Sequence, residues 1–324
     1  MLHLRVICPV DRTDDVVGVL GAASGATHVV VLRGVAVEPA GDSVQADVAR
    51  ESANEVIDAL EALGIARTGA IMVESVDTVL SKAAHRAEKM APGDPADSVV
   101  WEELISRTRE ESTLNGTFLA FLTIACLLAA VGVVTDSPVT IVGAMVVGPE
   151  FGPLAALAVA VSRRKLGLAR RSLIALLIGF PFAMVSTLLV TLLLERAGWM
   201  DIESLESLDQ VDYIYRVGAL SFLVSLLAGA AGMLALVSSK SAALVGVFIS
   251  VTTVPAAGFA VVAVTVGEWR IAALSVCQLG VNIVGIVVAG VFVLAVRLRR
   301  GTDPGRLLAQ ARSRRGAPPD RRRR

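Results

Sequence analysis

Residues 148–153 read Gly-Pro-Glu-Phe-Gly-Pro, and they interrupt the apolar segment Val139–Val161 near its middle. Each proline lacks a backbone N–H and clashes with the preceding helical turn, so this segment cannot form one regular helix. Freed backbone groups at membrane depth are tolerated only inside protein or beside a water-filled cavity. The stretch therefore predicts a broken membrane helix with a candidate site around Glu150. The neighbouring residues that we include in this site are Gly148, Pro149, Gly152 and Pro153.

Composition places the chain among α-helical integral membrane proteins. Apolar and aromatic residues with cysteine make up 54% of the 324 residues, and only 19% are charged. Soluble chains usually carry about 25% charged residues, and fibrous, disordered and disulfide-rich secreted classes are excluded. A spanning helix needs about 20 apolar residues. Six segments meet this requirement: Thr117–Val134, Val139–Val161, Leu173–Leu194, Val217–Val237, Ala242–Val266 and Ile271–Val296.

The loops between these segments alternate in charge. Five basic residues lie within residues 163–171, between the second and third segments, and Lys240 lies between the fourth and fifth. The stretch Glu195–Arg216, on the opposite side, is acidic. Because basic loops mark the cytoplasmic side, we expect a multi-pass protein of the bacterial inner (plasma) membrane with its N- and C-termini in the cytoplasm.

The six segments are also related to one another. A shift of 102 residues places the first three over the last three without a gap, and Pro153 then meets Pro255. Three spans in each half require opposite orientations, so we predict a 3+3 inverted repeat, an arrangement typical of transporters. Chance similarity among small apolar residues is the alternative explanation. Just before Pro255, Thr252 and Thr253 each offer a hydroxyl that can bond a freed carbonyl, and both join the candidate site.

Three carboxylate or amide side chains lie inside predicted spans. Glu150 is the one carboxylate near a span centre, where a charge costs at least ~2.5 kcal/mol, so it should face the protein interior. It is either a titrating cation or proton site or a protonated carboxyl with a structural role. Gln278 and Asn282 lie four residues apart on one helical face. They predict interhelical hydrogen bonds or, together with Glu150 and Thr252, one polar site.

Residues 1–90 are predicted to form an α+β domain in the cytoplasm. Periodicity places strands at 2–8, 27–32, 43–48 and 70–76, and helices at 13–23 and 51–63. Gly64 ends the second helix as a C-cap. The order βαββαβ is that of the ferredoxin-like class. This domain has two alternative roles: packing or oligomerisation, and ligand sensing.

Two further segments flank the membrane domain, which covers residues 116–296. Residues 91–115 are predicted to be a linker and an amphipathic helix on the membrane surface. Its apolar face carries Val100, Trp101, Leu104 and Ile105. Residues 297–324 hold 11 arginines against two aspartates, which predicts a disordered tail that attracts anionic lipid headgroups. No aromatic residue lies among these arginines, so nucleic acid is not an expected partner.

No metal, cofactor or catalytic site is predicted. The three cysteines have no metal-binding or redox spacing, and the three histidines, His3, His28 and His85, are not expected to cluster. The motifs Gly-x-Ser-x-Gly and His-Glu-x-x-His are absent. We therefore do not expect an enzyme.

The membrane part resembles a known family. Residues 136–145, Asp-Ser-Pro-Val-Thr-Ile-Val-Gly-Ala-Met, and the block 148–153 are similar to the uncharacterised hydrophobic membrane proteins of the DUF389 family. The resemblance covers roughly residues 100–296. It implies a multi-pass membrane protein of bacteria or archaea without an established activity. Many members have an apolar residue where Glu150 stands, so the resemblance implies no role for that carboxylate.

Two functions from different classes fit these features. We expect a transporter or channel-like protein for an unknown small solute or ion, with a cytoplasmic regulatory domain. The alternative is a membrane-anchored sensor or scaffold that binds an effector or partner, including a second copy of the chain, through residues 1–90. The inverted repeat favours transport, whereas the large soluble domain fits both.

Overall fold

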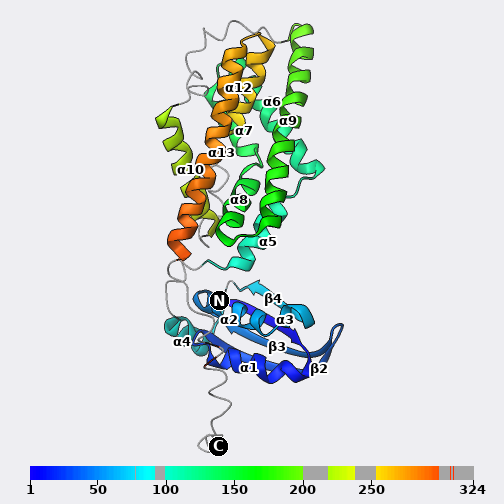
Figure 1. Cartoon of the computed structure of the whole chain (residues 1–324), viewed down its shortest axis with the longest axis vertical. Coiled ribbons are helices and arrows are strands. Elements are labelled where there is room, and N and C mark those ends of the chain that lie inside the picture. Colours follow the sequence, from blue (N-terminus) through cyan, green and yellow to red (C-terminus); the bar gives the residue numbers. More distant parts are fainter. Residues whose placement is uncertain are drawn as a thin grey trace, which may run out of the picture. The chain divides into compact units, whose positions relative to one another are not determined.

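The computed structural model describes residues 1–76, 78–91, 99–199, 218–237 and 253–298, together with Leu307 and Ala309. The chain forms two compact units (Figure 1). The first contains Met1–Glu103 and the C-terminal end from Arg299, and the second contains Leu104–Leu298. Each unit has a hydrophobic core of its own.

Four strands form one antiparallel sheet in the first unit, in the order β2-β3-β1-β4. They are β1 (Leu2–Cys8), β2 (Ala26–Val37), β3 (Ala40–Val48) and β4 (Ala70–Ser75). All four predicted strands are confirmed, and β1 has the predicted bounds. β2 runs five residues further than predicted because it stays paired with β3 up to the hairpin, where Val37 lies opposite Ala40.

Helices pack on this sheet and complete the core. They are the 3-10 turn η1 (Val10–Arg12), α1 (Thr13–Ala22), α2 (Arg50–Ala62), α3 (Ile65–Thr68) and α4 (Lys82–Met90). Val16 and Leu20 of α1 and Leu60 of α2 are buried in one cluster with the inward face of β1 and β3. Gly64 adopts φ +79° directly after α2, as the C-cap prediction requires. α4 was not predicted, and Ser81 caps it by accepting the Ala83 amide at 3.1 Å.

Helix α5 (Trp101–Glu111) begins in the first unit. Asn54 of α2 donates through Nδ2 to the Val99 carbonyl at 2.6 Å and accepts the Trp101 amide at 3.1 Å. Val100 belongs to the core of this unit, and Trp101 is 7% exposed. Protein therefore buries the start of the predicted apolar face. Placement of this helix on a membrane surface remains a prediction, and linker residues 92–98 lie outside the described residues.

The Arg-rich tail is described at few positions. Leu307 is 3% exposed and belongs to the core of the first unit. The predicted disorder of residues 297–324 falls mostly on residues outside the described part of the chain.

The second unit consists of helices. After α5 these are α6 (Gly116–Val134), α7 (Pro138–Val147), α8 (Phe151–Arg163), α9 (Leu166–Arg196), α10 (Ala219–Val237), α12 (Thr253–Thr265) and α13 (Trp269–Leu298). Within the described residues, α6, α9, α10 and α13 are long and apolar enough to cross a membrane. The bent pair of α7 and α8 is a fifth candidate if it counts as one span. The protein is therefore helical and multi-pass.

The sequence predicts six spans, and the structure accounts for four or five. α12 covers only the second half of the predicted segment Ala242–Val266, because residues 238–252 lie outside the described part. α9 begins at Leu166, seven residues before its predicted segment. Hydropathy marks the apolar part of a helix and does not detect charged first turns. The sixth span remains a prediction.

Small residues bring these helices into close contact. A Cβ atom on Gly258 of α12 would lie 2.6 Å from the Cβ of Ala129 on α6. One on Gly229 of α10 would lie 2.6 Å from the Cα of Ile286 on α13. Close backbone approach of this kind drives helix association where water is absent. α8 packs against α9 and α13, and α12 packs against the same two helices.

Candidate functional site

The predicted break in the second apolar segment is present. α7 ends at Val147, α8 begins at Phe151, and the two helix axes differ by 55°. Gly148 closes the last turn of α7 through its amide, which donates to the Ala144 carbonyl at 3.2 Å. Pro149 follows and has no N–H with which to continue the helix. Glu150 then occupies the N-cap position of α8.

Glu150 is the centre of the break. Its side chain is 0% exposed, and Oε1 accepts a hydrogen bond from the Thr253 hydroxyl at 2.7 Å. Among the described residues, Oε2 has no hydrogen-bond partner. This oxygen occupies the space where a Cβ on Gly148 would lie, so the glycine makes room for the carboxyl group. A buried acceptor without a partner is costly, which makes this point of the membrane unit the candidate site.

Thr253 brings a second helix to Glu150. It is the first described residue of α12, and Pro255 lies two positions after it, as Pro153 lies two positions after Phe151 in α8. Proline is tolerated in a first helical turn, where its missing N–H would have no intrahelical partner. The sequence predicted that Thr252 or Thr253 would donate a hydrogen bond to a freed backbone carbonyl. The structure instead bonds Thr253 to the carboxylate, and Thr252 lies outside the described residues.

The described helices around Glu150 contain few ionisable side chains. α7 and α12 contain none. Cys126 of α6 is close enough for an electrostatic effect of Glu150 on its thiol. A Cβ on Gly152 would lie 2.6 Å from the Cβ of Glu111, so α5 packs on the first turn of α8 there. In α9 and α13, apart from Cys277, ionisable side chains occur only near the helix ends: Arg170, Arg171, Glu195, Arg196, Arg270 and Arg297.

Gln278 and Asn282 form a separate hydrogen-bonded group. Gln278 Nε2 donates to Asn282 Oδ1 at 2.8 Å, and it also donates to the Ser221 hydroxyl of α10. Both residues are buried, and Gln278 Oε1 has no partner in the described part of the chain. The predicted interhelical bonding between α10 and α13 is confirmed. Gln278 Nε2 bonds Ser221 and Asn282 rather than Glu150, and inclusion of Gln278 and Asn282 in one site with Glu150 remains a prediction.

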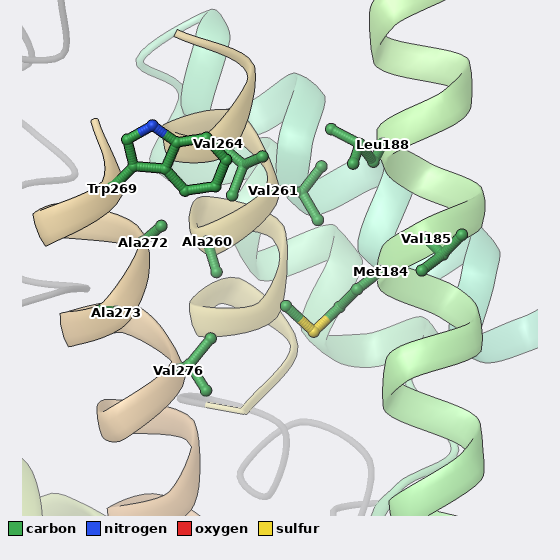
Figure 2. A pocket seen from close by; sticks show the side chains of 10 residues that line it. All are labelled: Met184, Val185, Leu188, Ala260, Val261, Val264, Trp269, Ala272, Ala273 and Val276. Carbon is green, nitrogen blue, oxygen red and sulfur yellow. The ribbon is translucent and has the colours of Figure 1, made fainter. Parts of the chain in front are cut away.

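An apolar groove of about 480 Å³ lies between α9, α12 and α13 (Figure 2). Its floor is formed by small or buried residues, including Ala260 and Ala272. The indole ring of Trp269 stands beside Val264 in Figure 2. The groove is lined by Met184, Val185, Leu188, Ala260, Val261, Val264, Trp269, Ala272, Ala273 and Val276. Apart from the indole N–H, these side chains offer no polar group, so the groove suits an apolar occupant.

The first unit contains a polar cluster that the sequence analysis missed. Histidines were not expected to meet, but His3 Nδ1 and His28 Nδ1 lie 2.9 and 2.7 Å from the two carboxylate oxygens of Asp47. A carboxylate only accepts, so both rings donate. His28 Nε2 then accepts from the Ser81 hydroxyl at 2.8 Å. Because Ser81 also caps α4, the cluster ties that helix to β2.

Strand register explains why the cluster was missed. β1 and β3 place His3 opposite Asp47, and a bulge in β2 between Thr27 and Val30 brings His28 to the same carboxylate. Burial alone would raise the Asp47 pKa, but the hydrogen bonds from His3 and His28 outweigh it and lower the pKa. Cross-strand register depends on turns and bulges, which residue periodicity does not reveal.

The first unit also contains a buried carboxylate. Asp42 is 1% exposed, and its Oδ2 accepts from the Thr13 hydroxyl at 2.7 Å. The hydrogen bond from Thr13 and the one from the Gly34 amide at 2.8 Å hold the Asp42 pKa below its ordinary value. These bonds join the hairpin of β2 and β3 to the start of α1, which is a structural role.

Comparison with known proteins identifies one domain. Residues 145–288 match the model of a domain of unknown function, DUF389. This range begins in α7, includes the break at Glu150 and ends within α13. No curated protein and no solved structure matches the chain. The resemblance found in the sequence is therefore confirmed, and it supplies no activity.

Proposed function

Because the membrane unit contains a DUF389 domain of unknown function, we propose a function from its geometry: the protein moves a small solute or ion across the membrane through a site at Glu150. The observation that carries this proposal is the hydrogen bond between Glu150 and Thr253. It joins the N-cap of α8, which follows a break, to a second apolar helix, α12. In transporters built from inverted repeats, such broken helices form the binding site near the middle of the bilayer.

Helix bounds support the repeat. A shift of 102 residues carries the end of α8 at Arg163 onto the end of α12 at Thr265. The same shift carries the starts of α6 and α9 to within one residue of the starts of α10 and α13. Chance similarity of apolar residues is the alternative explanation, and these three matched bounds count against it.

Packing and direction agree with an inverted repeat. The contacts of α8 with α9 and α13 become those of α12 with α13 and α9 when the halves are exchanged. In Figure 1 the colours show that α9 and α13 run in opposite directions, as inversion requires. These features support six spans in two halves, which would put both termini on one side of the membrane. The basic residues within 163–171 favour the cytoplasm as that side, together with a ferredoxin-like first unit. The βαββαβ order and the fully antiparallel sheet support that class.

Transport in this proposal depends on a carboxyl group that can change its partner. With Oε1 held by Thr253 and Oε2 unpaired, Glu150 can take up a proton or bind a cation without breaking its existing bond. Its burial excludes bulk water, so any change of charge must be coupled to a ligand or to movement of the helices. A Glu150 carboxyl group with only a structural role would not need to gain or lose a proton.

The test is flux in proteoliposomes that contain the full-length protein. Currents on a supported membrane are recorded after concentration jumps of NaCl, KCl or sodium gluconate, at several pH values. We expect wild-type flux to depend on pH. Glu150→Gln should remove that dependence, because the amide keeps the shape and cannot titrate. Thr253→Val should change flux in the same pH range, because it removes the hydroxyl that holds Oε1.

Thr191→Val is the matched control. Its hydroxyl is also buried in the membrane unit, but it bonds the Thr187 carbonyl of its own helix at 2.8 Å. This variant should keep wild-type flux. If Glu150→Gln shows the same pH-dependent flux as the wild type, the carboxyl is structural and the proposed mechanism fails. Folding is checked by gel filtration of each variant in detergent.

A sensor or scaffold is the second candidate function. β2 is an edge strand, and its Val30, Leu32, Val35 and Val37 are 41–88% exposed. An apolar open edge can pair with a strand of another chain. The flux assay separates the two functions, because a sensor or scaffold predicts no flux for the wild-type protein.

A further inference from the structure

The groove of Figure 2 lies between apolar helices of the membrane unit, and a membrane that these helices cross would present lipid to its open rim. It opens between α9 and α13, with α12 beneath it. Among the described residues, all ten that line it are apolar apart from the indole N–H of Trp269.

Each wall of the groove is one stripe of a helix. α13 contributes Trp269, Ala272, Ala273 and Val276, which follow the spacing of a single helical face. The floor is closed, since Ala260 and Val261 are at most 3% exposed. The rim is open, since Val185 is 57% and Trp269 is 69% exposed. An occupant can therefore enter from the bilayer and rest on alanine and valine.

The end of the groove at Trp269 has the chemistry of the membrane interface. Trp269 is the first residue of α13, after Gly267 and Glu268, and Arg270 follows it. Tryptophan is enriched at the level of the lipid headgroups, and an arginine beside it suits a phosphate. The apolar stripe then continues inward to Val276, about two helical turns deeper.

A helix from a second copy fits this groove less well. An α-helix with its side chains is about 10–12 Å wide, so 480 Å³ holds little more than one turn. Stable protein interfaces bury about 800 Å² on each partner, which is more than a ten-residue groove provides. We therefore propose that the groove between α9, α12 and α13 binds one acyl chain of a phospholipid, with its headgroup at Trp269 and Arg270.

Quenching of Trp269 fluorescence by brominated lipid tests this proposal. The chain has three tryptophans, so Trp101→Phe and Trp199→Phe leave Trp269 as the single reporter. Full-length protein in detergent is titrated with phosphatidylcholine that carries dibrominated acyl chains. The reference protein has Trp269→Phe and Phe292→Trp, because Phe292 is 67% exposed on α13 outside the groove. Trp269 should be quenched at a lipid-to-detergent ratio at least tenfold lower than the reference.

Two alanines provide matched variants on the same helix. Ala273 lines the groove, whereas Ala295 is exposed near the other end of α13. Ala273→Phe should fill the groove and bring Trp269 quenching to the ratio of the reference, and Ala295→Phe should leave it unchanged. If the Trp269 reporter and the Phe292→Trp reference, both without a substitution at Ala273 or Ala295, are quenched at the same lipid-to-detergent ratio, the groove makes only ordinary lipid contact. Absence of Trp269 quenching in bilayers made entirely of brominated lipid would show that protein covers the groove. Either result overturns the proposal.

Discussion

Asp47 shows how one carboxylate connects three elements of the first unit. It accepts from His3 of β1 and His28 of β2, and His28 in turn accepts from Ser81 at the start of α4. Asp47 is 17% exposed and the two histidines about one third. Partial exposure to water weakens each bond, so the cluster stabilises the unit modestly. Its effect should be largest where α4 meets β2.

Replacement of Asp47 should loosen this junction. Asp47→Ala leaves two histidine donors without an acceptor, which should cost about 1 kcal/mol, the low end for a buried loss. Faster amide exchange in β2 and α4 of the full-length protein, measured by mass spectrometry, would report it. Asp58→Ala on α2 is the control, because no hydrogen bond of that carboxylate is found among the described residues. Unchanged exchange in Asp47→Ala would show that the cluster contributes nothing to stability.

The same cluster has a defined pH dependence. The folded-state pKa of Asp47 is lowered, so its contribution is fully present above the ordinary aspartate pKa of about 3.9. It is lost as the pH falls through the lower folded-state value, where the unfolded chain binds the proton more readily. Asp47→Ala and wild type should therefore differ in exchange rate at pH 5–7 and converge below about pH 4. A difference that persisted at low pH would point to packing as its cause.

At the scale of elements, α12 depends on close contact with α6. Gly258 faces Ala129 at a distance that leaves no space for a methyl group. Gly258→Ala should push the two helices apart and destabilise the membrane unit by about 1–3 kcal/mol. Gly280→Ala is the control, since nothing lies within 4 Å of its added Cβ. The midpoint of thermal unfolding in detergent should fall for the first variant only. An equal midpoint for both would mean that α12 can shift without cost.

At the scale of the molecule, loop charge determines orientation. Arg163, Arg164 and Lys165 end α8 and precede α9, and basic loops stay in the cytoplasm. Reporter fusions after Arg164 and after Arg306 should be cytoplasmic, and a fusion after Glu206 should be external. A fusion that is external after Arg306 would remove the six-span arrangement and, with it, the inverted repeat.

The sequence alone determined the features that depend on neighbours along the chain. Alternation located β1 to the residue, and the prolines located the break before Phe151. Apolar length identified the membrane helices, because burial in lipid requires about 20 apolar residues wherever a span lies. These signals are local, so no knowledge of the rest of the fold was needed.

Tertiary structure decided which distant residues meet. The sequence indicated Glu150 as a buried carboxylate, but only the packing of α12 showed that its partner is Thr253, 103 positions away. Register and a bulge brought two histidines to Asp47, and the side chain of Asn54 fixed the start of α5. Composition also gave no sign of a groove, because a groove is the space that small side chains leave between packed helices. Contacts of this kind depend on how elements pack, which periodicity and hydropathy do not record.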